Sequence, residues 1–238
     1  MSAADDVACV LVAAGRGERL GESRPKALVE VAGMSMVEHA VRAIAASQVR
    51  HLVVVAPEAN VEHMAELVRA HAASLATSTV VAGGATRQAS VARGLDVVPA
   101  AADVVLVHDA ARCLAPAELY DDVARAVLDH HDAVIPGLPV VDTLKEVDDE
   151  GGVRATLPRA RLRAIQTPQG FRRSLLLRAH AAAGADEAPD DASMVEALGV
   201  PVQVVTGHPD AFKVTRPLDL ALAEIVAARS RPAPKPAP

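Results

Sequence analysis

The sequence predicts an α/β fold, a single Rossmann-like domain in which helices flank a mostly parallel sheet. Short β-branched runs alternate with amphipathic segments of helical length along most of the chain. Several runs are apolar throughout, which is typical of strands buried on both faces of a parallel sheet. The 238 residues are 51% hydrophobic and only 1% aromatic, so we expect one large core of Val, Leu, Ile and Ala.

The first half of the chain follows this alternation closely. Strands are expected over residues 7–13, 51–56, 79–82 and 103–107, where β-branched residues cluster, and helices over 35–46, 60–71 and 86–98. Ser35, Asn60 and Thr86 are residue types that cap helix N-termini. Repeated strand–helix alternation implies right-handed crossovers and helices on both faces of the sheet.

The second half contains one interruption. A helix over 116–130 begins with Pro116 in its first turn. It is followed by a strand over 132–136, helices over 171–183, 191–198 and 217–229, and a strand over 202–206. The segment 139–164 instead reads as two strands around the turn residues 148–152, which predicts a protruding β-ribbon arm. A lone ribbon is marginal in water, so we expect it to pack on a second subunit as a dimerisation arm.

Composition excludes several function classes. The net charge of -6 and the scarcity of aromatics argue against a nucleic-acid partner. No apolar run is long enough to span a membrane, and the N-terminal residues lack the order of a signal peptide. Cys9 and Cys113 show no metal or redox spacing, so we expect a cytoplasmic protein. The domain is expected to cover residues 1–229, with a disordered Pro/Ala tail at 230–238.

The loop after the first strand carries the strongest chemical indication. Ligands of open parallel sheets bind beyond the carboxyl ends of the strands. Here glycines allow close approach of a ligand to the backbone, and Arg16, Arg19 and Lys26 add three cations within eleven residues. The loop lacks the P-loop pattern, and Leu20 stands where a dinucleotide fingerprint needs glycine. This combination favours a triphosphate site.

Five segments together resemble a known family. The motif LVAAGRGERL followed by PK is similar to that of the sugar-nucleotidyltransferase superfamily. Four further segments resemble the 2-C-methyl-D-erythritol 4-phosphate cytidylyltransferase family: residues 83–91, 107–112, 166–171 and 212–220. This resemblance implies a Mg²⁺-dependent enzyme that transfers CMP from CTP to 2-C-methyl-D-erythritol 4-phosphate. The products would be 4-diphosphocytidyl-2-C-methyl-D-erythritol and pyrophosphate, in non-mevalonate isoprenoid biosynthesis.

The resemblance also implies roles for individual residues. The catalytic cations would be Arg19, Lys26 and Lys213. The CTP-binding residues would be Ala13, Ala14, Gly15, Arg16, Gly17, Gly83, Arg87 and Ser90. The acceptor would be bound by Asp109, Arg112, Thr143 and Arg159, the last two reaching a neighbouring subunit from the arm. Asp109, which directly follows a buried strand, is also the candidate Mg²⁺ ligand.

Alternatives remain open at this stage. Asp109 could cap the next helix, Arg159 could belong to a solvated basic stretch, and Lys213 could be a surface lysine. Pro189 stands where relatives commonly have Thr, which puts part of the acceptor site in doubt. A ribitol-5-phosphate cytidylyltransferase would share the triphosphate loop and differ only in acceptor contacts. A non-catalytic nucleotide-binding module is a more distant alternative.

Overall fold

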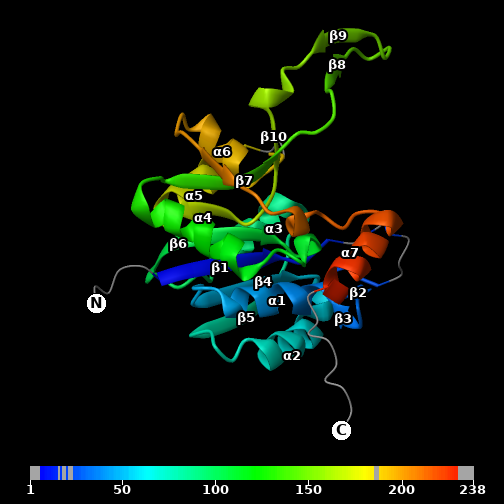
Figure 1. Cartoon of the computed structure of the whole chain (residues 1–238). Coiled ribbons are helices and arrows are strands. Elements are labelled where there is room, and N and C mark those ends of the chain that lie inside the picture. The colour runs from blue at the N-terminus through cyan, green and yellow to red at the C-terminus, as the bar shows by residue number, and fades with distance from the viewer. Residues whose placement is uncertain (1–5, 16, 18–19, 21–23, 185–187, 230–238) are drawn as a thin grey trace.

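The computed structural model of the chain describes residues 6–15, 17, 20, 24–184 and 188–229. Its centre is an eight-stranded sheet with helices on both faces (Figure 1). The strands run in the order β10-β7-β11-β6-β1-β4-β5, and β12 pairs with β7. Their bounds are β1 Asp6–Val12, β4 His51–Ala56, β5 Thr77–Ala82, β6 Ala102–Asp109, β7 Ala133–Pro139, β10 Arg163–Ile165, β11 Gln169–Arg172 and β12 Gln203–Thr206.

The middle of the sheet is parallel, as predicted. β1 pairs in parallel with β4 on one side and with β6 on the other, and β4 continues the parallel order to β5. β1, β4 and β6 consist largely of Val, Leu and Ala, which suit a pleated surface buried on both faces. The carboxyl ends of β1, β4, β5 and β6 therefore lie along one edge of the sheet.

Helices of the two layers cover opposite faces, because residues of the strands alternate between them. In β1, Val7, Cys9 and Leu11 belong to one buried cluster, which also includes residues of α1 (Met36–Ala46), α2 (Val61–His71) and α4 (Ala117–Asp129). Ala8 and Val10 belong to the other cluster, with residues of α3 (Arg87–Leu95), α5 (Arg173–Ala182) and α6 (Asp191–Ala197). The sheet is thus sandwiched between two aliphatic cores.

The prediction of one helix over 171–183 is wrong at its start. Phe171 lies in β11, which runs antiparallel to both β6 and β7, and α5 begins only at Arg173. The short strand β10 was also not predicted, and it pairs antiparallel with β7. Both strands have three or four residues, too few for a period-2 pattern to be recognised. The predicted helix over 86–98 is likewise shorter, because α3 ends at Leu95.

A third, smaller buried cluster lies between the C-terminal helix α7 (Pro217–Arg229) and the small hairpin of β2 (Glu30–Val31) and β3 (Met34–Ser35). Its members include Val31, Met36 and Val214. Ser35 caps α1, accepting from the Glu38 backbone N–H, while the Glu38 carboxylate accepts from Ser35. This cluster anchors the chain on either side of Lys26 and of Lys213.

The segment 139–164 contains a two-stranded antiparallel ribbon of β8 (Lys145–Val147) and β9 (Val153–Thr156). The ribbon forms a sheet of its own and projects away from the body of the molecule (Figure 1). Val141, Val147 and Val153 are more than half exposed there. Exposed valines contribute little hydrophobic stabilisation to the fold, so these side chains form apolar surface that their own chain leaves uncovered.

Candidate active site

A cavity of about 600 Å³ opens at the carboxyl ends of the parallel strands. Its volume lies within the usual range of small-molecule binding pockets, about 300–1,000 Å³. Four chain segments meet around it: the loop after β1, the start of α3, the end of β6 and the loop before α7. Its described lining consists of Val12, Ala13, Ala14, Gly15, Gly17, Lys26, Ala27, Gly84, Ala85, Thr86, Arg87, Ser90, Asp109, Ala110, Ala111, Lys213 and Thr215.

The loop after β1, where the sequence predicts a triphosphate site, lines one side of the cavity. Gly17 has φ +77°, which favours glycine, and a Cβ built there would lie 2.8 Å from Cβ of Lys26. This close approach holds the glycine loop against η2 (Lys26–Leu28), whose first residue lines the cavity. The predicted cations Arg16 and Arg19 lie outside the described residues.

The turn before α3 forms the opposite wall. Thr86 caps α3 by accepting from the Ala89 N–H, and Ser90 Oγ accepts from the Gly84 N–H at 3.0 Å. Gly83 does not line the cavity itself, but a Cβ built there would lie 2.5 Å from Cβ of Ala14. The small residues therefore let the turn and the β1 loop pack closely against each other.

Three charged side chains from distant parts of the chain meet in the cavity. Asp109, at the end of β6, accepts from Arg87 Nε at 3.1 Å through Oδ1. Its other oxygen accepts from Lys213 Nζ at 2.8 Å. Asp109 is 11% exposed and Lys213 is 40% exposed, so the lysine is the more accessible group. Asp109 is therefore not simply a helix cap, and Lys213 is not an isolated surface lysine, because the two form an ion pair in the cavity.

The cations keep Asp109 ionised. Burial alone would raise its pKa, but Arg87 and Lys213 outweigh burial and hold the pKa well below its usual range. The carboxylates of Asp191 and Asp109 likewise outweigh the effect of burial on Arg87 and raise its pKa. Both groups therefore carry their full charges at neutral pH.

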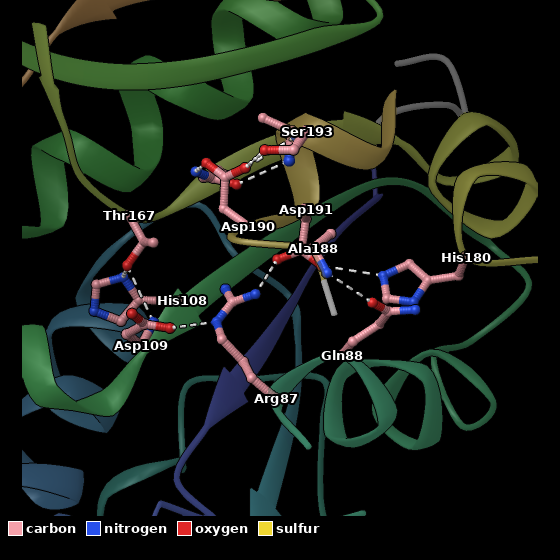
Figure 2. A network of polar contacts seen from close by, with 12 residues as sticks. Arg87, Gln88, His108, Asp109, Thr167, His180, Ala188, Asp190, Asp191 and Ser193 are labelled. Atoms are coloured by element: carbon pink, nitrogen blue, oxygen red, sulfur yellow. Dashed lines mark hydrogen bonds and ion pairs between the residues drawn. The ribbon is translucent and has the colours of Figure 1, made fainter. Parts of the chain in front are cut away.

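Asp109 is also held through its backbone. Its N–H donates to Thr167 Oγ1 at 3.0 Å, and the same oxygen lies 3.0 Å from His108 Nδ1 (Figure 2). His108 Nε2 lies 3.3 Å from the Arg112 carbonyl oxygen. Because a carbonyl can only accept, Nε2 carries the hydrogen and Nδ1 accepts from the Thr167 hydroxyl. His108 thus has a structural position beneath the site.

The predicted acceptor residues are divided between two places. Asp109 lies in the cavity, whereas Arg112 is turned away and donates to the carbonyls of Ala211 and Ile165 at 2.8 and 3.1 Å. Thr143 and Arg159 lie on the exposed segment that carries the ribbon, and neither lines this cavity. Arg112 therefore connects the end of β6 to β10 and to the loop before Lys213.

Asp109 is the sole carboxylate among the described lining residues, and those residues contain no group of three potential metal ligands. Each of its oxygens already accepts from one cation. Mg²⁺ commonly takes most of its ligands from substrate phosphates and water, with only one or two carboxylates from the protein. The donor set is compatible with that mode of binding and unsuited to an all-protein metal site.

Two residues that were not predicted from the sequence, Asp191 and His180, complete this charged site. Asp191, the first residue of α6, is fully buried and accepts from Arg87 Nη1 at 2.8 Å. Its other oxygen lies 3.0 Å from Nε2 of His180 on α5. Pro189, the position where relatives commonly have Thr, stands next to Asp190 at the start of α6. A charged residue that is also the first of an amphipathic helix gives no sequence signal of burial.

A cavity lined by cations and glycine-containing backbone, at the carboxyl edge of a largely parallel sheet, is suited to binding the phosphates of a nucleotide. The sequence profile of the 2-C-methyl-D-erythritol 4-phosphate cytidylyltransferase family matches residues 7–229. The chain belongs to this family. It is therefore an enzyme of the nucleotidyltransferase class, a cytidylyltransferase.

Relatives and solved structures agree with this assignment. A Streptomyces avermitilis 2-C-methyl-D-erythritol 4-phosphate cytidylyltransferase is 53% identical over 232 residues, covering 94% of this chain and 92% of the relative. The enzyme of the same name from Saccharopolyspora erythraea is 51% identical, with 93% and 99% covered. The crystal structure of the Thermus thermophilus enzyme of that name has a TM-score of 0.74 at 38% identity, with 92% of this chain and 98% of that chain covered.

No helix in the described ranges is long and apolar enough to cross a membrane.

Proposed function

We propose that the cavity binds CTP and transfers its CMP group to 2-C-methyl-D-erythritol 4-phosphate. The observation that carries this proposal is the meeting of Lys26, Arg87 and Lys213 with glycine-containing backbone around one cavity. A triphosphate needs cations and backbone N–H groups around its oxygens while one phosphorus is attacked. Family membership supports CTP as the nucleotide and the methylerythritol phosphate as the acceptor.

In the proposed reaction, a phosphate oxygen of the acceptor attacks the α-phosphorus of CTP in line. A new P–O bond forms, the bond from the α-phosphorus to the oxygen bridging it to the β-phosphorus breaks, and pyrophosphate leaves with that electron pair. A phosphate monoester is an anion near neutral pH, so no general base is required. This fits the lining, where the one described carboxylate is paired with two cations.

Catalysis would then rest on position and charge. Lys26 and Lys213, together with Arg19, would neutralise charge that builds up on the phosphates in the transition state. Arg87 and Ser90 would form the wall that binds cytosine and ribose, with Gly83 behind it allowing the close packing on Ala14, while Ala13 to Gly17 would line the phosphates. Mg²⁺, bound through substrate phosphates and at most one oxygen of Asp109, would supply further charge neutralisation.

We also propose that the ribbon arm forms a homodimer in the cytoplasm. Thr143 and Arg159 lie on the arm and do not line the cavity of their own chain, and in a dimer they would contact the acceptor bound to the second copy. The exposed valines of the arm supply apolar surface for that contact. Both cysteines are free and buried, as suits a reducing compartment.

The direct test is pyrophosphate release with CTP and each candidate acceptor. We expect turnover with 2-C-methyl-D-erythritol 4-phosphate and little with ribitol 5-phosphate. Turnover with ribitol 5-phosphate alone would identify the chain as a ribitol-5-phosphate cytidylyltransferase. Pro189 would then belong to a site that binds ribitol 5-phosphate. No pyrophosphate release with either acceptor would refute the proposed function.

Lys26→Ala tests the mechanism within the same assay. We expect a loss of several orders of magnitude in kcat, since a cation that stabilises the transition state is removed. Arg125→Ala is the matched control, because Arg125 is an exposed cation on α4 whose partner is Asp122 on the same helix. Near-normal turnover of Lys26→Ala would contradict the mechanism.

A further inference from the structure

A buried polar chain continues behind the cavity, beyond the residues to which a role has been given. From the cavity inward, it runs from Lys213 to Asp109, Arg87, Asp191 and finally His180. Figure 2 shows the part from Asp109 to His180. Each neighbouring pair is within 3.1 Å. The last two members do not line the cavity, so they can affect a ligand only through Arg87.

Asp191 is the most constrained member of this chain. It is 0% exposed, and both of its oxygens are engaged, Oδ2 by Arg87 and Oδ1 by His180. Burying a carboxylate is costly unless it is paired and hydrogen-bonded, so Asp191 requires both neighbours. The His180 side chain is itself only 7% exposed.

The backbone around Asp191 is also fixed. The preceding residue, Asp190, caps α6 by accepting from the Ser193 N–H at 2.9 Å. The amide of Gln169, on strand β11, donates to Asp190 at 2.8 Å. Asp191 is therefore held by the sheet and by α6, and its carboxylate is a rigid anchor for the guanidinium group of Arg87.

Arg87 is thereby gripped from two sides. Its Nε points to Asp109 on the cavity side, and its Nη1 points to Asp191 at the back. Two carboxylates that bind different nitrogens of one planar group fix its orientation as well as its position. Loss of the rear carboxylate, or of the group that holds it, would allow Arg87 to rotate about the Asp109 contact.

We propose that Asp191 and His180 are positioning residues that orient Arg87 for binding of the nucleotide. This inference rests on the proposed function of the cavity, because it takes Arg87 as part of the CTP-binding wall. His180 holds Asp191 by donating from Nε2, and Asp191 holds Arg87. The pair thus sets the affinity for CTP and leaves the transfer step to Lys26 and Lys213.

The main test compares two substitutions of His180. His180→Gln keeps an N–H donor near the position of Nε2, whereas His180→Phe keeps the bulk and removes the donor. We expect His180→Phe to raise KM for CTP about tenfold, the size of one lost hydrogen bond to a charged group. We expect kcat to change less than about twofold, and His180→Gln to restore KM to within about twofold of the wild type.

Asp191→Asn is an independent second variant. It keeps the shape of the side chain but removes the charge that grips Arg87, so it too should raise KM for CTP. His51→Phe is the matched control. His51 is a buried histidine paired with Asp6 at 3.3 Å, at the start of β4 and hence at the opposite edge of the sheet. It should lower the thermal midpoint without raising KM.

Three results would overturn the proposal: an unchanged KM in His180→Phe, an equal rise in His180→Gln, or an equal rise in His51→Phe. A second readout needs neither CTP nor turnover, namely hydrogen exchange of the Arg87 Nε–H followed by NMR in the ligand-free protein. His180→Phe should speed this exchange about tenfold and His180→Gln should not. If the wild type releases no pyrophosphate but this exchange pattern holds, the proposed function fails and the positioning role stands.

Discussion

Acidification should destabilise this protein through His108, a residue beneath the active site. Its ring is fully buried, and the ring centroid lies 5.0 Å from that of Tyr120. As a neutral ring it satisfies both neighbours, accepting from the Thr167 hydroxyl and donating to the Arg112 carbonyl. A second ring proton would point at Thr167 Oγ1, which already accepts from the Asp109 N–H.

The magnitude follows from the pKa. Burial, reinforced by Arg112 and opposed by Asp109, lowers the pKa of His108 from 6.5 to about 4. Between these two pH values the unfolded chain binds a proton that the folded protein does not, so stability falls as the pH falls. At about 1.4 kcal/mol per pH unit, this gap amounts to about 3 kcal/mol. Well above the unfolded pKa the residue contributes no pH dependence.

The assay is urea unfolding of the wild type and of His108→Gln at several pH values from about 7 to about 4, the range that spans both pKa values. Gln retains a donor for the Arg112 carbonyl but cannot be protonated. At neutral pH we expect the variant to have a lower free energy of unfolding, because it has lost the packing of the ring. On acidification its free energy of unfolding should fall by about 3 kcal/mol less than that of the wild type. Parallel stability curves for the two proteins would refute this account of His108.

Three further predictions concern the site and its support. Lys213→Gln should lower kcat about 100-fold or more in the pyrophosphate assay, because it removes a cation from the phosphates. An unchanged kcat would remove Lys213 from the mechanism. Gly83→Ala should raise KM for CTP and cost about 1–3 kcal/mol in urea unfolding, since its Cβ would lie 2.5 Å from Cβ of Ala14. A wild-type KM and a wild-type free energy of unfolding would show that the turn at Gly83 and the loop at Ala14 can move apart without energetic cost. Ser35→Ala should cost about 1 kcal/mol of stability through loss of the α1 cap, with kcat/KM unchanged.

Local pattern predicted much of the fold, and the reason is visible in particular elements. β1 and β4 are continuous apolar runs because both of their faces are buried, and such runs can be read directly. α1 follows a capping box and has its apolar residues on one face. β11 could not be predicted in the same way. Its four residues are fixed by pairing with β6 and β7, which lie far away in the sequence.

In the candidate site, too, local motifs predicted some features and tertiary contacts decided others. The glycine loop, Lys26, Asp109 and Lys213 stand in motifs after strands, and the structure brings all of them to one cavity. Arg112 stands in such a motif too, yet its side chain donates to the backbone of other segments. Motifs fix where the backbone runs, whereas the direction of a long side chain depends on which acceptors folding places nearby.

The amino-acid sequence by itself determined the parallel core, the edge of the sheet that carries the cavity, and the identity of its cations. It did so because strand periodicity, helix caps and glycine turns act over a few residues. The tertiary structure alone decided that Asp109 lies between Arg87 and Lys213, and that Asp191 and His180 stand behind them. Asp109 and Lys213 are 104 residues apart, as are Arg87 and Asp191. The free energy of such ion pairs depends on burial and geometry that arise only when the whole sheet has formed.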